Sequence, residues 1–336
     1  MFYKDSDFLF IVGVQKCGTS TLFDVLSRHN KVIPSKIKEP QFLALPKKVV
    51  EKNRKWYENL FEGDNSSMLL DGSTFYYQSK RAWKNIRRFF NNPHIIIIIR
   101  DPVRRAHSAH THMVKQVPTC DLRSFDEIVK KTKKHSEDGV PLYRVEDKII
   151  KEDVERGKVN EEYVNKSYLR KRLGVSFNSK FEDTLWPYRY FTVSEYHKKI
   201  EKMKKMFGSS RVKVVVLEKL IEEPSHIIAE IFNFLDLPSE LSNRLELPQK
   251  NQTKLPKNTL GRTLIWIRRN SSVGSKIWNY FRSGAGPIAK SIWKMVRKPK
   301  PTLSKKTYER ARGIIEHEYE YWIEKRNNIR SLWSYN

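Results

Sequence analysis

Residues 8–22 constrain the fold of this chain more than any other stretch. The first seven of them are apolar apart from one glycine and rich in strand-forming side chains, which predicts a fully buried strand. A short turn with Lys16 and Gly18 follows, and an amphipathic helix then opens on three hydroxyl residues, Thr19, Ser20 and Thr21. A strand, a glycine turn and a helix N-terminus form a cradle for an anion, because backbone N–H groups converge there and the helix dipole and Lys16 add positive charge.

The spacing of this turn differs from that of the common nucleoside triphosphate loop. Gly13 and Gly18 fit G-x-x-x-x-G, but Thr19 and Ser20 follow where that loop has Lys-Ser/Thr, and Lys16 lies two residues before the second glycine. The common loop uses its lysine on the β- and γ-phosphates and its hydroxyl on Mg²⁺. An earlier lysine suits a donor of lower charge, with one ammonium at the bridging oxygen. The alternative is an ordinary βα turn with a surface lysine.

A second strand-to-helix junction follows residues 94–99. Five consecutive isoleucines predict a central strand, and Asp101 and Pro102 are suited to the cap and first turn of the next helix. Arg100 ends the strand and Ser108 lies two turns into the helix. A fixed cation beside a hydroxyl predicts a second phosphate site. The alternative is a structural pair between Arg100 and Asp101.

The loop at 31–43 carries one carboxylate among lysines. Glu39 lies close to Lys36 and Lys38, and prolines interrupt the segment. Because the loop directly follows the first βα unit, we expect it near the cradle, at the carboxyl edge of the sheet. An ionised glutamate there can act as a base. The alternative is a solvated loop glutamate.

The overall charge points to an anionic partner. The chain of 336 residues has 65 Lys and Arg against 38 Asp and Glu, a formal net charge of +27. A phosphorylated cofactor, an acidic polymer, nucleic acid or an acidic membrane would each fit. The excess is spread over many segments, which favours one domain over residues 1–336, with a core at about 7–250 and a basic, aromatic helical region at about 258–336.

Cysteine and histidine spacing predicts neither disulfides nor a metal site. Cys17 and Cys120 form no framework, which is compatible with a reducing cytoplasm. His107, His110 and His112 have no carboxylate at ligand spacing. The polar N-terminus predicts no signal peptide, and the longest apolar run is too short to span a bilayer, so we expect a soluble, cytoplasmic protein.

The rest of the chain repeats the strand–helix pattern. We expect a short strand that runs into a polar turn over 68–77 and another strand at 211–217. Together with the first two strands they predict an α/β fold with a central parallel sheet flanked by helices and a helical C-terminal cap. Further helices are expected at 51–61, 81–90, 125–134, 224–235 and 307–325, and one after a Ser194 cap, through Met206. Residues 260–298 fit either helices packed over the sheet or amphipathic helices in peripheral contact with a membrane.

Three motifs together resemble the sulfotransferase superfamily, which has a P-loop-like three-layer fold. Residues 15–21 look like its 5′-phosphosulfate loop and residues 100–108 like its 3′-phosphate site, both for 3′-phosphoadenosine 5′-phosphosulfate (PAPS). Residues 38–42 are similar to the acidic loop of the heparan-sulfate branch, so carbohydrate sulfotransferases and their bacterial cousins look nearest. The resemblance covers most of the chain.

The resemblance implies a metal-independent transfer of a sulfonate group from PAPS to a hydroxyl or amine of a carbohydrate, with 3′-phosphoadenosine 5′-phosphate (PAP) as product. The basic surface favours an anionic carbohydrate. Lys16 would stabilise the leaving oxygen and Glu39 would act as the base, with Lys38, His107 and His110 as further catalytic candidates. The implied donor-binding residues are Lys16, Cys17, Gly18, Thr19, Ser20, Thr21, Arg100 and Ser108, and by position also Lys254, Lys257 and Arg262.

One departure from the heparan-sulfate pattern concerns the acceptor. That pattern has a lysine after the acidic residue near position 71, where this chain has Gly72. The missing cation would come from Lys36, Lys38 or another group. A small alcohol or amine natural product therefore stays open as the acceptor.

Two other classes of function are weaker. A P-loop kinase or NTPase should show Gly-Lys-Ser/Thr and a strand ending in aspartate for Mg²⁺, and neither is present. A basic module that binds nucleic acid or membranes would explain the charge but not the cradle, so no specific nucleic-acid partner is expected.

Overall fold

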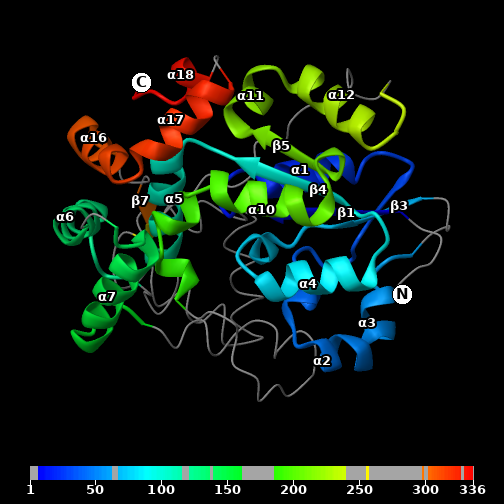
Figure 1. Ribbon diagram of the computed structural model, residues 1–336, viewed down its shortest axis with the longest axis horizontal. Coiled ribbons are helices and arrows are strands. Elements are labelled where there is room, and N and C mark those ends of the chain that lie inside the picture. Colours follow the sequence, from blue (N-terminus) through cyan, green and yellow to red (C-terminus); the bar gives the residue numbers. More distant parts are fainter. Residues whose placement is uncertain are drawn as a thin grey trace, which may run out of the picture.

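The protein is described from a computed structural model (Figure 1). The described residues are 7–62, 67–115, 121–136, 139–160, 185–239, 255–256, 297–298, 302–326 and 329–335. No helix within these ranges is both long and apolar enough to cross a bilayer.

A parallel five-stranded sheet forms the centre of the molecule. Its order is β2-β3-β1-β4-β5, with β1 in the middle and every neighbouring pair parallel. The strands are β1 (Phe8–Gly13), β2 (Val32–Pro34), β3 (Met68–Asp71), β4 (His94–Ile99) and β5 (Val212–Val216). A separate antiparallel pair joins β6 (Leu255–Pro256) to β7 (Arg297–Lys298). The predicted α/β fold with a central parallel sheet is confirmed.

Helices cover the sheet, as the alternation of strands and helices predicts. Figure 1 shows α4 and α10 beside each other, and α10 packs against both α4 and β5. The α-helices are α1 (Thr19–Leu26), α2 (Lys47–Lys52), α3 (Arg54–Glu58), α4 (Lys80–Phe89), α5 (Pro102–Val114), α6 (Phe125–His135), α7 (Leu142–Glu155), α10 (His197–Phe207), α11 (Leu217–Glu222), α12 (Pro224–Phe234), α16 (Lys305–Ile314), α17 (Glu316–Lys325) and α18 (Ile329–Leu332). Short 3₁₀ turns are η1 (Phe42–Ala44), η2 (Thr74–Tyr77), η3 (Trp186–Tyr188), η4 (Thr192–Ser194) and η5 (Ser209–Arg211).

The core is built on the two central strands. All six residues of β1 and all six of β4 are buried, and the five isoleucines of β4 are fully inaccessible. Burying an isoleucine side chain contributes roughly 1.5–3 kcal/mol. On one face of β1, the rings of Phe8 and Phe10 pack on Phe90, with centroids 4.5 and 5.0 Å apart. The sheet is therefore a rigid base for the turns that leave it.

The C-terminal region differs in detail from the single helix expected at 307–325. It forms α16 and α17, which are separated at Ile315, where φ is −129°. Tyr308 and Tyr319 each donate a hydrogen bond to Asp101 Oδ2, at 2.7 and 3.2 Å. Asp101 also caps α5, because its Oδ1 accepts from Arg104 N at 2.7 Å. The C-terminal helices thus dock on the corner between β4 and α5.

The predicted Ser194 cap is wrong by two residues, because Tyr196 occupies the N-cap position. The helix begins at His197, and Ser194 ends η4 instead. The Ser194 hydroxyl accepts from Arg105 Nε at 2.6 Å and donates to the carbonyl of Pro102 at 2.9 Å. The Ser194 hydroxyl is therefore bound by the buried Arg105 of α5 instead of capping a helix.

A substitution of Gly18 tests the turn on which the cradle depends. Gly18 has φ +88°, and a Cβ there would lie 2.6 Å from Leu217 Cδ1. We expect Gly18→Ala to lower the free energy of unfolding by about 1–3 kcal/mol, because the left-handed backbone is strained for alanine. Urea denaturation measures this change.

Gly313 on α16 is the matched control. A Cβ there meets no atom within 4 Å. Gly313→Ala should leave stability unchanged or raise it by up to about 1 kcal/mol, the difference in helix propensity. Equal unfolding midpoints for Gly18→Ala and the unmodified protein would show that the turn tolerates a side chain.

Candidate active site

The turn after β1 forms an open helix N-terminus. Gly18 is the N-cap of α1, and no side chain of the described residues caps this helix. The preceding turn is closed by a hydrogen bond from Cys17 N to Val14 O at 3.1 Å. Lys16 itself has a left-handed backbone, with φ 73°. Backbone donors at the start of α1 and the Lys16 ammonium therefore belong to one compact turn, which suits an anion.

The predicted donor-binding residues of this turn differ in exposure. Lys16, Gly18, Ser20 and Thr21 are half-buried, whereas Thr19 and Cys17 are buried. Burial raises the pKa of the Cys17 thiol to about 12. Cys17 can therefore contribute its backbone to the turn, but not a thiolate.

Lys16 lies in the electric field of three other charged side chains. Burial is the largest cause that lowers its pKa to about 8, followed by the positive charges of Lys115 and Arg100. The carboxylate of Glu39 acts in the opposite direction. The fold thus brings Lys16, Arg100 and Glu39, which are far apart in the sequence, into electrostatic contact, and adds Lys115, which the sequence did not single out.

Lys38 links the acidic loop to the cradle. Its ammonium donates to Ser20 Oγ at 2.5 Å and lies 3.5 Å from Glu39 Oε1. Both Lys38 and Glu39 are about 30% exposed at the side chain (30% and 29%), so water and a substrate can reach them. Glu39 and Gln41 have left-handed backbones, with φ 59° and 53°. The sharp loop therefore directs a carboxylate towards the start of α1.

A buried aspartate at the end of β3 holds this loop. Asp71 is fully inaccessible, and its carboxylate accepts from Tyr57 OH at 2.8 Å, Tyr76 OH at 2.9 Å and Ser73 Oγ at 2.7 Å. Ser73 Oγ in turn accepts from Gln41 N at 2.9 Å. Burial raises the pKa of Asp71 to about 6, although its three hydroxyl donors oppose this shift. Asp71 thereby fixes the loop just after Glu39.

The position next to Asp71 has no room for the lysine of the heparan-sulfate pattern. A Cβ at Gly72 would lie 2.6 Å from Phe23 Cδ2 on α1. Phe23 is itself buried, with 7% of its surface exposed. Among the described residues, Lys38 is the cation placed beside Glu39, at the distance given above.

The guanidinium of Arg100 has one hydrogen-bond donor that is not used by any described residue. Its Nε is buried and has no hydrogen-bond partner among the described residues; the nearest recorded carboxylate, Glu218 Oε1, is 3.8 Å away. Glu218 is held by other donors, Asp101 N at 3.2 Å and Trp333 Nε1 at 3.2 Å. The alternative was a structural pair between Arg100 and Asp101. The carboxylate near Arg100 belongs to Glu218 instead, and Asp101 accepts from Arg104 N and Tyr308 OH. Arg100 is thus ion-paired with Glu218, but its guanidinium keeps a donor that no described residue accepts from, which fits a phosphate.

Ser108 lies on the same strand–helix unit as Arg100. It is half-buried on α5, two turns after the strand. The carbonyl of Arg100 accepts from Tyr196 OH at 3.0 Å, which anchors the end of β4 to the start of α10. The unit therefore presents a positioned guanidinium and a hydroxyl.

The two histidine candidates pack on the α6 side of α5. His107 and His110 are 6% and 7% exposed, and their rings lie 5.1 and 5.7 Å from Phe125. His110 Nε2 is 2.8 Å from the carbonyl of Arg123, and burial lowers the His110 pKa. Both rings therefore pack against the first residue of α6.

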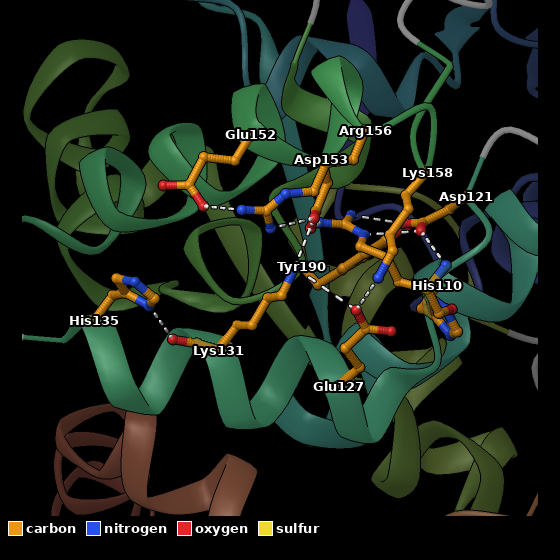
Figure 2. Close-up of polar contacts among 11 residues, drawn as sticks. His110, Asp121, Glu127, Lys131, His135, Glu152, Asp153, Arg156, Lys158 and Tyr190 are labelled. Atoms are coloured by element: carbon orange, nitrogen blue, oxygen red, sulfur yellow. Dashed lines mark hydrogen bonds and ion pairs between the residues drawn. The ribbon is translucent and has the colours of Figure 1, made fainter.

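Figure 2 shows the ion-pair cluster to which His110 belongs. Arg123 Nη2 lies 2.7 Å from Asp121, and Arg123 Nη1 lies 3.3 Å from Asp153. Lys131 reaches Asp153 at 2.6 Å from α6. This cluster joins α6 to α7, and it supports a structural role for His110.

Several residues of the candidate site had no clear signal in the sequence. Asp71 stood out only as a departure from a family pattern, and Glu218 and Lys115 carried none. Their roles depend on contacts between residues distant along the chain. Lys254, Lys257 and Arg262, and almost all of 260–298, lie outside the described residues, so these predictions stay untested.

Curated proteins that are similar in sequence to this chain include enzymes whose names refer to heparan sulfate. One is the bifunctional heparan sulfate N-deacetylase/N-sulfotransferase 1 of Caenorhabditis elegans, 29% identical over 111 residues, which are 32% of this chain and 13% of that protein. Another is human heparan sulfate glucosamine 3-O-sulfotransferase 3B1, 27% identical over 124 residues, 37% of this chain and 30% of that protein. The matched stretches thus cover less than a third of each relative's length.

Solved structures give partial superpositions. A sulfotransferase from Alicyclobacillus acidocaldarius has a TM-score of 0.47 and 20% identity, covering 80% of this chain and 98% of its own. The sulfotransferase domain from the curacin biosynthetic pathway has a TM-score of 0.40 and 13% identity, covering 93% and 98%.

The sulfotransferase domain family matches over residues 6–286. This range includes the cradle, the acidic loop and the Arg100 unit, and it is most of the chain. The chain therefore belongs to the sulfotransferase family of enzymes.

Proposed function

We propose that this enzyme transfers a sulfonate group from PAPS to a hydroxyl or amine of a carbohydrate. The observation that carries the proposal is the convergence of three side chains from separate motifs. Burial and the charges of Lys115 and Arg100 lower the Lys16 pKa, while Glu39 raises it. A phosphosulfate donor between two cations, with a carboxylate beside it, uses each of these groups.

Each end of the donor has a matching group. The turn at Gly18 and the uncapped start of α1 suit the 5′-phosphosulfate, since backbone donors and Lys16 converge there. The buried Arg100 Nε, which lacks an acceptor among the described residues, suits the 3′-phosphate, and Ser108 adds a hydroxyl on the same unit. The two sites would hold opposite ends of the donor, across the edge of the sheet.

The transfer uses one base and two cations. Glu39 takes the proton of the acceptor, the acceptor oxygen or nitrogen forms its bond to sulfur, and the bond between sulfur and the bridging phosphate oxygen breaks. Lys16 stabilises the charge that develops on that oxygen. Lys38, which lies between Ser20 and Glu39, supplies the cation that Gly72 cannot carry. In this scheme, the base and both cations come from the chain itself.

A carbohydrate acceptor is supported by the named relatives and by charge. The curated relatives are heparan sulfate enzymes, and the net charge of +27 favours an anionic glycan. Sulfate transfer from labelled donor to a panel of glycans and small alcohols or amines tests this assignment. Transfer to glycans alone is expected; transfer only to small molecules would favour the natural-product alternative.

Ligand-induced thermal shifts test the donor assignment. We expect PAP to raise the Tm, and ATP–Mg²⁺ and DNA to have little effect. Lys16→Ala and Arg100→Ala should each weaken PAP binding by about tenfold to a hundredfold, because each removes a charge-assisted contact. Lys84→Ala, an exposed lysine on α4, is the control and should bind normally. Stabilisation by ATP–Mg²⁺ alone would contradict the sulfotransferase proposal.

Glu39→Gln tests the base. The turnover number should fall by about 10²–10⁴-fold, the usual contribution of a general base, while the Kd for PAP stays the same. Glu62→Gln, an exposed carboxylate paired with Lys36, should keep full turnover. If Glu39→Gln turns over normally, Glu39 is not the base, and His107, His110 and His112 are the next residues to substitute.

The titration of Lys16 predicts a pH dependence of donor binding. Lys16 is a cation below its pKa of about 8 and neutral above it, so PAP affinity should fall as the pH rises through 8. Phosphate groups are already ionised there, because their second pKa is about 6. In Lys16→Arg the cation persists, so calorimetric titrations from pH 7 to 9 should show a constant affinity. The same decline in both proteins would assign the effect to another group.

A further inference from the structure

A cluster of two histidines and a buried glutamate joins α10 to α17, away from the contacts of the candidate active site. His197 Nδ1 lies 2.5 Å from Glu318 Oε1, and His317 Nε2 lies 3.9 Å from the same oxygen. One ligand atom from each of the three residues fits within 4.8 Å of the others. Glu195 adds a second carboxylate, with Oε1 at 3.3 Å from His317 Nε2.

Glu318 needs a positive partner because it is completely inaccessible to water. Its oxygens accept from His197 N at 3.3 and 3.1 Å and from Trp322 Nε1 at 3.1 Å, which are neutral donors. A buried carboxylate with neutral donors is costly unless a cation balances it. The groups that can carry or bind that cation are the two imidazoles.

We propose that His197, His317 and Glu318 bind a divalent transition-metal ion and leave its fourth position open to solvent. Two imidazoles with one carboxylate and an open fourth position are a ligand set that zinc uses. The site goes beyond the proposed sulfonate transfer and does not depend on it.

The distances are close to those that a tetrahedral ion requires. Zinc lies about 2.0–2.2 Å from nitrogen and oxygen ligands, which places neighbouring ligand atoms about 3.4 Å apart. The separations from Glu318 Oε1 to His197 and to His317, 2.5 and 3.9 Å, lie on both sides of this value, and no pair within the set exceeds 4.8 Å. Side-chain shifts on the order of 1 Å would therefore open the His197–Glu318 hydrogen bond and admit the ion.

The surroundings favour a formed and accessible site. The His197 ring stacks on Tyr321, with centroids 4.9 Å apart, which fixes the direction of Nδ1. The His317 side chain is 42% exposed and gives an ion a route from solvent. Because Glu318 and its neighbour Tyr319 are adjacent on α17, a bound ion would hold the same helix that donates to Asp101 at the Arg100 corner.

Binding should compete with protons. The hydrogen bond to Glu195 raises the pKa of His317, while burial and the nearby Lys198 act against this. Imidazole must be neutral to bind a metal, so affinity should increase from pH 6 to pH 7.5 and protons should be released on binding.

Calorimetric titration of the untagged full chain with Zn²⁺ tests the site. One ion per chain is expected, with a rise in Tm, and Co²⁺ should give the visible absorption of a tetrahedral complex. His317→Gln should weaken Zn²⁺ binding by at least tenfold and abolish the Tm rise. Because this residue is exposed, the variant should fold, which circular dichroism verifies.

His226→Gln is the matched control. His226 Nε2 lies 3.3 Å from Glu230 on α12, so it is a histidine–glutamate pair without a second histidine. This variant should bind Zn²⁺ as the unmodified chain does. Unchanged affinity and Co²⁺ spectrum in folded His317→Gln would overturn the proposal, as would the absence of Zn²⁺ binding by the unmodified chain.

Discussion

The pairing of β1 with β4 at the centre of the sheet determines where the candidate site can form. The strands are parallel, with Gly13 opposite Ile97, and the ladder continues beyond β1 through a bond from Val14 N to Ile98 O at 2.9 Å. Both strands therefore end at the same edge, one at the Lys16 turn and the other at Arg100. Because parallel strands direct their carboxyl ends together, the Lys16 turn and the end of β4 at Arg100 become neighbours.

Buried carboxylates then set the positions of the loops at that edge. Asp71 holds the acidic loop through hydroxyl groups, Asp101 joins the corner after β4 to the C-terminal helices, and Glu218 accepts from Asp101 N and Trp333. Such groups are costly to bury, and each is satisfied by several donors. Removing one partner would leave a buried charge with too few hydrogen bonds, so these loops are constrained more than their exposed neighbours.

The positive charges of Lys16, Lys115 and Arg100 repel one another. Burial together with the charges of Lys115 and Arg100 brings the pKa of Lys16 to about 8. An anion bound between Lys16 and Arg100 would relieve this repulsion, since opposite charges interact strongly in a partly buried site. The same positive charges that lower the pKa of Lys16 in the free protein would thus favour the binding of a phosphorylated ligand.

The local sequence determined the elements and the chemistry of the turns. The apolar runs of β1 and β4 predicted buried strands, and Thr19, Asp101 and Pro102 marked the helix starts, because these signals act within a few residues. The tertiary structure alone decided the Asp71 hub, the recruitment of Ser194 by Arg105, and the meeting of His197 with Glu318. These contacts join residues up to 121 positions apart, and their partners are selected by packing and by the need to satisfy buried polar groups, which no local pattern records.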